Sequence, residues 1–215
     1  MTDAFARHRR AMACWLLVVC GITFGMVILG GLTRLTHSGL SMTTWSITGS
    51  LPPLSEVAWQ AEFERYQQFP EYKLLNQDMT LGGFKSIFWY EYSHRMLGRL
   101  IGGVYLLPML YFFARRAVPS WLAPRLLGLL GLLLTQGLVG WWMVRSGLVD
   151  RPDVSHIRLT THLGLAFAFF GSMWWVALTL LRKQAQPAPL PGTALLGRLL
   201  LVVAGMVYGL SLIHI

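Results

Sequence analysis

Residues 88–114 read FWYEYSHRMLGRLIGGVYLLPMLYFFA. From residue 93 onward the stretch is apolar and long enough to cross a membrane as a helix, which takes about 20 residues. Its first part nevertheless carries Glu91, His94, Arg95 and Arg99. Ionisable side chains are rare in membrane helices and usually face a bundle interior, a cavity or a cofactor. The stretch therefore predicts both a membrane helix and a functional site near its end.

The composition extends this interpretation to the whole chain. The 215 residues are 54% hydrophobic and only 13% charged, whereas soluble domains carry about 25% charged residues. Three further apolar runs, at 11–33, 124–144 and 159–181, are also long enough to span a membrane. We therefore predict an all-α integral membrane protein with a four-helix bundle.

The chain divides around these runs. A signal peptide is the competing interpretation of the first one, but the run exceeds the usual apolar length of about 7–15 residues and lacks a small-x-small cleavage site. The outer loop should contain one or two short helices over the membrane mouth. The predicted segments are a basic tail at 1–10, a transmembrane unit at 11–181 with an outer loop at 34–88, a Pro-rich linker at 182–197, and the start of a fifth, truncated transmembrane helix at 198–215.

Charged residues predict the orientation. The net charge is +9, but the basic residues recur at the ends of apolar runs and form no single patch, which argues against nucleic acid as a partner. Short loops rich in Lys and Arg face the cytoplasm, so the N-terminus is expected there, with loops 34–88 and 145–158 outside. Cys14 and Cys20 lie six residues apart in one helix, on different faces, which makes a disulfide between them implausible.

Short internal similarities predict a repeat. VILGGLTRLTHSGL ends the first run and QGLVGWWMVRSGL ends the third, while YSHRMLGRLIGG and LTTHLGLAFAFF both place Leu-Gly shortly after a histidine. Two repeated helical hairpins would explain this agreement with the number of spans. A pseudo-two-fold axis would then place His94 and His162 at similar depth on facing helices.

Two facing imidazoles could hold one haem iron between them, because neutral imidazole is an axial haem ligand. The alternative is two histidines bonded to neighbouring helices or to interfacial water. His156 and His37 are expected at the rim and in loop packing, respectively.

Glu91 precedes His94 by three residues, so the two side chains share a helix face. The carboxylate could orient the imidazole or handle protons; pairing with Arg95 or Arg99 is the structural alternative. Arg95, Arg99 and, beside His156, Arg158 could bind haem propionates, although structural pairing of the first two is an equal expectation. The sequence contains no nucleotide-binding or hydrolase motif.

The stretches GGLTRLTHSGLSMTTW, EYSHRMLGRLIGG, QGLVGWWMVRSGL and VSHIRLTTHLGLAF resemble the haem A synthase family of cytochrome oxidase assembly, found in proteobacteria and mitochondria. The resemblance covers nearly all of 12–181. It implies an inner-membrane enzyme with two similar four-helix halves, which oxidises a methyl group of haem O to the formyl group of haem A. It also implies that His94 and His162 are the N-terminal histidine pair and that Glu91 is the catalytic glutamate.

The resemblance further implies that this half holds the substrate haem O and that a C-terminal half, absent here, holds haem b. It leaves open partnership with a haem O synthase, an electron donor and further copies of the chain. The outer loop lacks the cysteine pair that some family members have. Two rival functions remain at this stage: a membrane b-type cytochrome or haem carrier that uses the same histidines, and a transporter with a Glu91–His94 proton relay.

Overall fold

A computed structural model describes residues 3–46, 48–148 and 152–182. The predicted linker and fifth helix lie almost entirely outside this part of the chain. All regular structure in the described residues is helical. In chain order the helices are α1 (Asp3–Leu35), α2 (Glu56–Tyr66), α3 (Pro70–Leu75), α4 (Leu81–Ala114), α5 (Ala123–Gly147) and α6 (His156–Leu181).

Four helices, α1, α4, α5 and α6, are long and apolar enough to cross a membrane, which confirms the four predicted spans. Two of them begin earlier than their apolar runs. α4 starts at Leu81, where the Thr80 hydroxyl caps it by accepting from the Gly83 N–H at 3.2 Å. Glu91 and His94 therefore lie well inside a helix of about 51 Å and not at its mouth. α1 likewise continues back to Asp3 through the basic tail.

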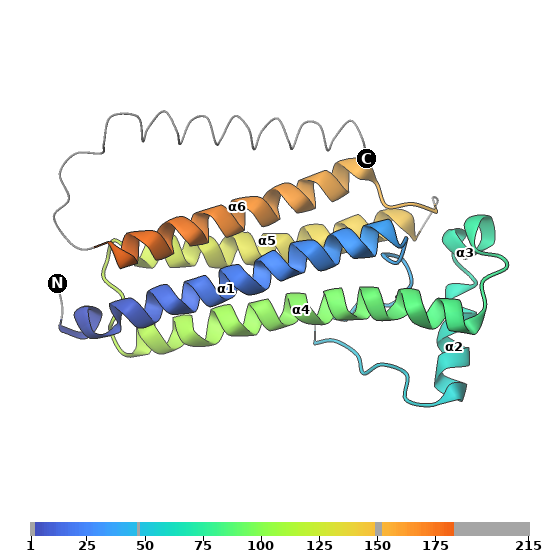
Figure 1. Cartoon of the computed structure of the whole chain (residues 1–215), viewed down its shortest axis with the longest axis horizontal. Helices are drawn as coiled ribbons and strands as arrows, with labels where there is room; N and C mark the ends of the chain where they lie inside the picture. Colours follow the sequence, from blue (N-terminus) through green and yellow to red (C-terminus); the bar gives the residue numbers. More distant parts are fainter. Residues whose placement is uncertain (1–2, 47, 149–151, 183–215) are drawn as a thin grey trace.

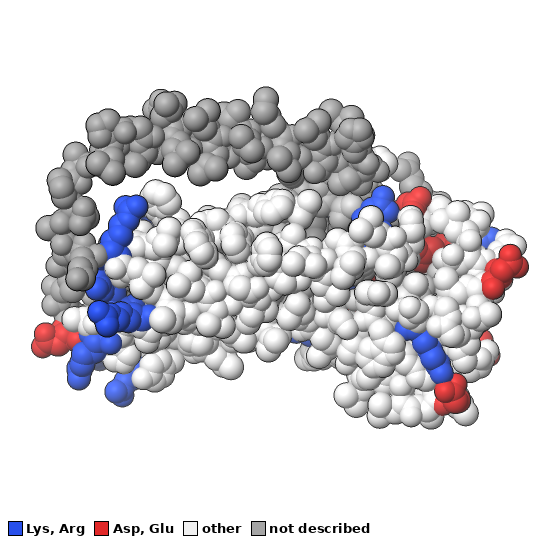
Figure 2. Space-filling model, viewed as in Figure 1, with Lys and Arg blue, Asp and Glu red and all other residues white. Residues whose placement is uncertain are grey.

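The long helices form a bundle with α2 and α3 at one end (Figure 1). α1 packs against α4 and α6, and α5 packs against α6 and α4. Helices α4 and α6 consequently lie diagonally across the bundle, each between the same two neighbours. Lys and Arg gather at the end opposite α2 and α3 (Figure 2), which we call the basic end. The end with α2 and α3 is called the loop end.

The apolar core fills only the half of the bundle next to the basic end. Its buried side chains stop at Cys20 on α1, Ile101 on α4, Leu129 on α5 and Phe169 on α6. Toward the loop end, no apolar side chain is buried in four described segments, which are 21–35, 91–100, 130–147 and 156–168. Because protein interiors are normally close-packed, this half of the bundle is the natural place for a bound group. Both candidate histidines lie in it.

Helices α2 and α3 confirm the predicted short helices of the outer loop. α2 packs on α4 through a second apolar cluster that includes Trp59, Phe63, Phe84 and Phe88. Ser55 caps α2 by accepting from the Ala58 N–H at 3.2 Å. Pro70 occupies the first turn of α3, where a backbone N–H has no partner within the helix and its absence costs no hydrogen bond. This end of the molecule is thus a folded cap on the extended part of α4.

Glu71 of α3 is buried in this cap, with 4% of its surface exposed. It accepts a hydrogen bond from the Tyr66 hydroxyl at 3.0 Å, and Asn76 donates to the Tyr66 oxygen at 2.8 Å. Burial raises the pKa of Glu71 to about 8, and the negative charges of Glu91 and Asp153 also raise this pKa. Burial and the neighbouring Glu71 raise the pKa of Tyr66 above its usual range.

The first prediction concerns pH. A carboxyl whose folded pKa is raised contributes stability that is complete below its unfolded pKa and lost as pH rises through the folded value. Local stability of the α2–α3 cap should therefore fall between about pH 4.5 and about pH 8. Hydrogen exchange of 59–76, corrected for intrinsic rates, should show faster opening at the higher pH.

Glu71→Gln, which stays neutral, should flatten this pH dependence. Glu64→Gln is the matched control, because Glu64 is an exposed carboxyl on α2. A Glu71→Gln variant that kept the full pH dependence would contradict the assignment.

Candidate functional site

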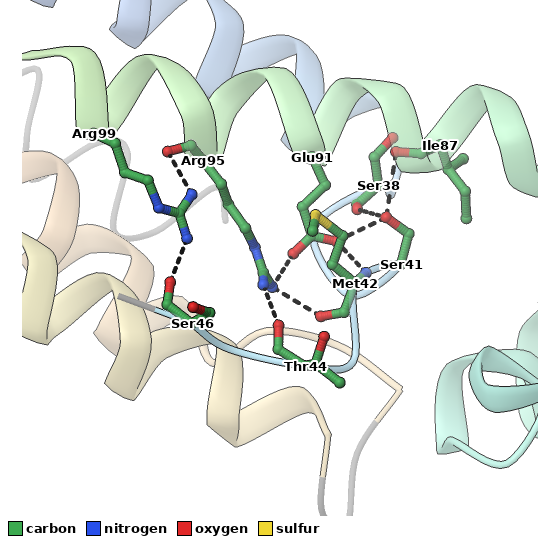
Figure 3. Close-up of polar contacts among 9 residues, drawn as sticks. All are labelled: Ser38, Ser41, Met42, Thr44, Ser46, Ile87, Glu91, Arg95 and Arg99. Carbon is green, nitrogen blue, oxygen red and sulfur yellow. Dashed lines mark hydrogen bonds and ion pairs between the residues drawn. The ribbon is translucent and has the colours of Figure 1, made fainter. Parts of the chain in front are cut away.

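Glu91 and Arg95 form a buried ion pair one turn apart on α4, with 2% and 8% of their surfaces exposed. The Glu91 carboxylate also accepts from the Ser41 hydroxyl and from the Met42 N–H, both at 2.7 Å. Ser41 is itself fixed by the Ser38 carbonyl at 3.0 Å. Figure 3 shows the carboxylate enclosed by these donors. The structure thus shows the pairing that the sequence offered as the structural alternative for Glu91.

The arginines of α4 hold the loop that follows α1. Arg95 donates to the carbonyls of Thr44 and Met42 at 2.7 and 2.8 Å and lies 4.9 Å from the centre of the Trp45 ring. Arg99 donates to the Ser46 carbonyl at 2.5 Å. Residues 41–46, which we call the strap, are therefore laid along α4 from Glu91 toward Arg99 (Figure 3).

His94 lies on the side of α4 that faces α1. A Cβ atom added to Gly30 of α1 would come within 3.1 Å of the His94 Nε2 atom. Among the described contacts of Glu91 none is to His94, so the carboxylate orients the strap and not this imidazole. Gly30 leaves room for the His94 ring, because a larger side chain at position 30 would press on the imidazole.

His162 repeats this arrangement on α6. A Cβ atom added to Gly140 of α5 would come within 2.9 Å of its Cε1 atom. Each histidine is therefore seated on a glycine of the preceding long helix.

Gln136 of α5 contacts His162 directly, with 3.3 Å between its amide nitrogen and Nε2. If the amide N–H donates, the imidazole is neutral and the Nε2 lone pair accepts this hydrogen bond, so a metal could bind Nε2 only in place of the Gln136 N–H. The Nδ1 atom of His162 and the Oε1 atom of Gln136 are buried with no hydrogen-bond partner in the described part of the chain. Buried polar atoms without partners are uncommon and call for an explanation.

The remaining predicted residues lie near the rim. Arg158 donates to the Trp142 carbonyl at 2.8 Å, and its guanidinium carbon lies 4.3 Å from the centre of the Trp142 ring. His156 is exposed at the first position of α6, and His37 is exposed in the turn after α1, with a φ of 49°. Cys14 and Cys20 are free, as predicted.

Sequence reasoning missed Gly30, Gly140, Gln136 and Ser41. The two glycines lie within the similar motifs that end the first and third apolar runs, but the motifs do not distinguish them from the neighbouring glycines. Gln136 is a polar residue inside an apolar run, which was a visible signal. The partner of Ser41 is 50 residues away in the chain, and no local pattern identifies it.

Comparison with known proteins gives a consistent result. The sequence model of the COX15-CtaA family, described as cytochrome oxidase assembly protein, matches residues 13–213. Similar relatives are the Heme A synthases of Rhodospirillum centenum (53% identical, covering 85% of this chain and 49% of the relative), Parvibaculum lavamentivorans (52%, 86% and 53%) and Nitrosomonas eutropha (47%, 84% and 51%).

This chain spans about half the length of the curated relatives that it matches. No solved structure matches it. The family match extends over most of the chain and includes all four long helices. The chain is thus a multi-pass membrane protein of the COX15-CtaA family of cytochrome oxidase assembly proteins.

Proposed function

We propose that this chain is the substrate-binding half of a haem A synthase, which oxidises a methyl group of haem O to the formyl group of haem A. The proposal rests on relatives of 47–53% identity that bear the name Heme A synthase. The structural observation that supports it best is the pair of glycine-seated histidines, each of which lies in the half of the bundle beyond the apolar core. In this proposal a b-type haem belongs to the second half of a full-length enzyme.

The residues present fit a haem held by His94 and His162. The two side chains come from diagonal helices. Near His162, two buried polar atoms lack hydrogen-bond partners in the described residues: its own Nδ1 atom and the amide oxygen of Gln136, the residue that contacts its Nε2 atom. When bound, the haem would supply the iron and the methyl group to be oxidised. The protein's part is to orient the macrocycle through the imidazoles and to exclude water through the α2–α3 cap.

The arginines differ in what they contact and in how far they are buried. Arg95 is directed at the strap and at Glu91, and its buried Nε atom has no partner in the described residues. Arg158 is at the rim and only partly buried. We therefore assign propionate binding to Arg158, and we assign to Arg95 and Arg99 the indirect role of holding the strap.

Glu91 is the proposed proton-handling group, with the proton held at Oε2 beside the Ser41 hydroxyl. The rival function is a haem carrier that lacks this chemistry. Glu91 is enclosed by Ser41, Met42 and Arg95, which gives the carboxylate a structural role. This observation favours the haem carrier, in which Glu91 has no chemical role. The two functions make different predictions for Glu91 variants.

Orientation is the second prediction. Because Lys and Arg gather at the basic end and cytoplasmic loops are enriched in them, the α2–α3 cap should face away from the cytoplasm. In a variant without Cys14 and Cys20, a membrane-impermeant thiol reagent added to intact cells should label Gln68→Cys but not Arg115→Cys. The reverse labelling pattern would overturn the orientation.

The third prediction tests the histidine seats. Gly140→Ala and Gly30→Ala should displace His162 and His94, respectively, because their Cβ atoms would lie 2.9 and 3.1 Å from the imidazole rings. Haem affinity should fall, and the absorption and electron paramagnetic resonance spectra of bound haem should change. The effect should be larger for Gly140→Ala, where the contact is closer.

Gly137→Ala and Gly31→Ala are matched controls on the same two helices, because a Cβ atom at either position would meet nothing within 4 Å. Both should bind haem normally and gain slightly in helix propensity. Equal haem binding by all four variants would remove the seats from the site.

Glu91 provides the fourth prediction, tested in a protein of the relatives' full length. Glu91→Gln should leave haem bound, since both histidines remain, while haem A output falls by about 10²–10⁴-fold, the range for loss of a general acid–base group. Pigment extraction should then show haem O or a partly oxidised product.

Ser41→Ala is the comparison that separates chemistry from structure. It removes a strap contact without removing the carboxylate. If hydrogen exchange in 41–46 rises equally in both variants and haem A output falls equally, Glu91 acts only through the strap. Normal haem A output from Glu91→Gln would exclude any proton-handling role.

A further inference from the structure

The loop after α1 reaches below the membrane boundary. Arg115 directly follows α4 and marks the boundary at the basic end, as interfacial arginines do. Arg99 precedes Ala114 by 15 residues, or about 22 Å at 1.5 Å per residue. The hydrocarbon core is about 30 Å thick. A loop that contacts Arg99 is therefore about 8 Å inside the opposite boundary.

The strap and the following glycine make this contact. The Ser46 carbonyl accepts from Arg99 at 2.5 Å. A Cβ atom on Gly49 would lie 3.3 Å from the Arg99 Nε atom, and Gly49 adopts a φ of 92°, which favours glycine. The chain thus reverses direction at the level of Arg99.

Non-helical backbone at this depth needs partners within the protein. Arg95 and Arg99 supply them, because they donate to the carbonyls of Met42, Thr44 and Ser46. The strap is therefore compatible with a position inside the membrane boundary.

Residues 48–55, the return segment, lead from this reversal back to α2. Leu51 and Leu54 of this segment line a cavity of about 340 Å³ together with Met42 and Thr44 of the strap. Pro52 and Pro53 lack N–H groups, which reduces the number of backbone donors that need partners. The return segment is thus suited to the same membrane level.

The outward side chains of this region form an apolar patch. Leu51, Leu54 and Val57 are 83%, 82% and 81% exposed. Val57 lies farther from this level, because the neighbouring Glu56 pairs with Lys85 of α4, which precedes Arg99 by 14 residues. The exposed positions that follow Val57 on α2 begin with Gln60 and Ala61. Leu51 and Leu54 are therefore the exposed apolar side chains of the loop that lie closest to the membrane level of Arg99.

We propose that Leu51 and Leu54 insert into the bilayer at the boundary between acyl chains and headgroups, making the return segment a membrane anchor beside α4. α4 itself exposes apolar side chains, which include Trp89, Met96 and Leu100. The partner is the phospholipid bilayer itself. The proposal requires only that the four long helices cross the membrane, and it does not depend on haem binding.

Spin labelling tests this surface. Single cysteines are introduced as Leu51→Cys and Leu54→Cys in a Cys14→Ala, Cys20→Ala variant, labelled with a nitroxide and reconstituted into phospholipid nanodiscs. Collision rates are measured with oxygen, which concentrates in lipid, and with a nickel chelate, which stays in water. The ratio of oxygen to nickel accessibility should be severalfold higher at these positions than at Gln60→Cys, the matched control on α2.

Two results would overturn the proposal. A ratio equal to that of Gln60→Cys would place the patch in water. Low accessibility to both reagents would mean that protein, such as a second copy of the chain, covers it. Size-exclusion elution and haem binding like those of the parent variant would show that each labelled protein is folded.

Discussion

The structure at the loop end depends on the buried ion pair of Glu91 and Arg95. Removing one partner of such a pair typically costs about 3–5 kcal/mol, because the other charge remains buried and unpaired. Here the pair also satisfies loop backbone groups: Glu91 accepts from the Met42 N–H, and Arg95 donates to the Met42 and Thr44 carbonyls. The pair therefore joins the loop after α1 to α4 and fixes the strap on this helix.

The sequence predicted the parts of the fold that follow from local composition. Four apolar runs gave four long helices, because hydropathy over about 20 residues reports membrane crossing directly. The extension of α4 back to Leu81 was not predicted, since residues 81–92 are helical through their packing under α2 and not through an apolar run. The strap could not be predicted either, because Ser41 and Glu91 meet only in the folded chain.

The candidate site likewise contains residues that the sequence could identify and features that only the folded structure reveals. The histidines were identifiable because ionisable residues in apolar runs are rare, and a short repeat indicated their pairing. Their seats are steric features: Gly30 and Gly140 matter for what a Cβ atom would touch, and a sequence rich in glycine does not distinguish them from Gly31 or Gly137. The end of the apolar core at Ile101 and Phe169 is likewise a property of packing that no single run displays.

Hydrogen bonding separates the two kinds of intramembrane polar residue that the sequence grouped together. Glu91, Arg95 and Arg99 make contacts that hold a loop in place, so their presence in a membrane helix has a structural explanation. His162 and Gln136 contact each other and hold no loop, and each keeps a buried atom without a partner in the described residues, as Arg95 does at its Nε atom. A polar atom left unsatisfied in a half of the bundle without an apolar core is stabilised only by something that binds there. On this physical ground we place the proposed binding face on the histidine side of α4 and α6, with the strap side of α4 as its support.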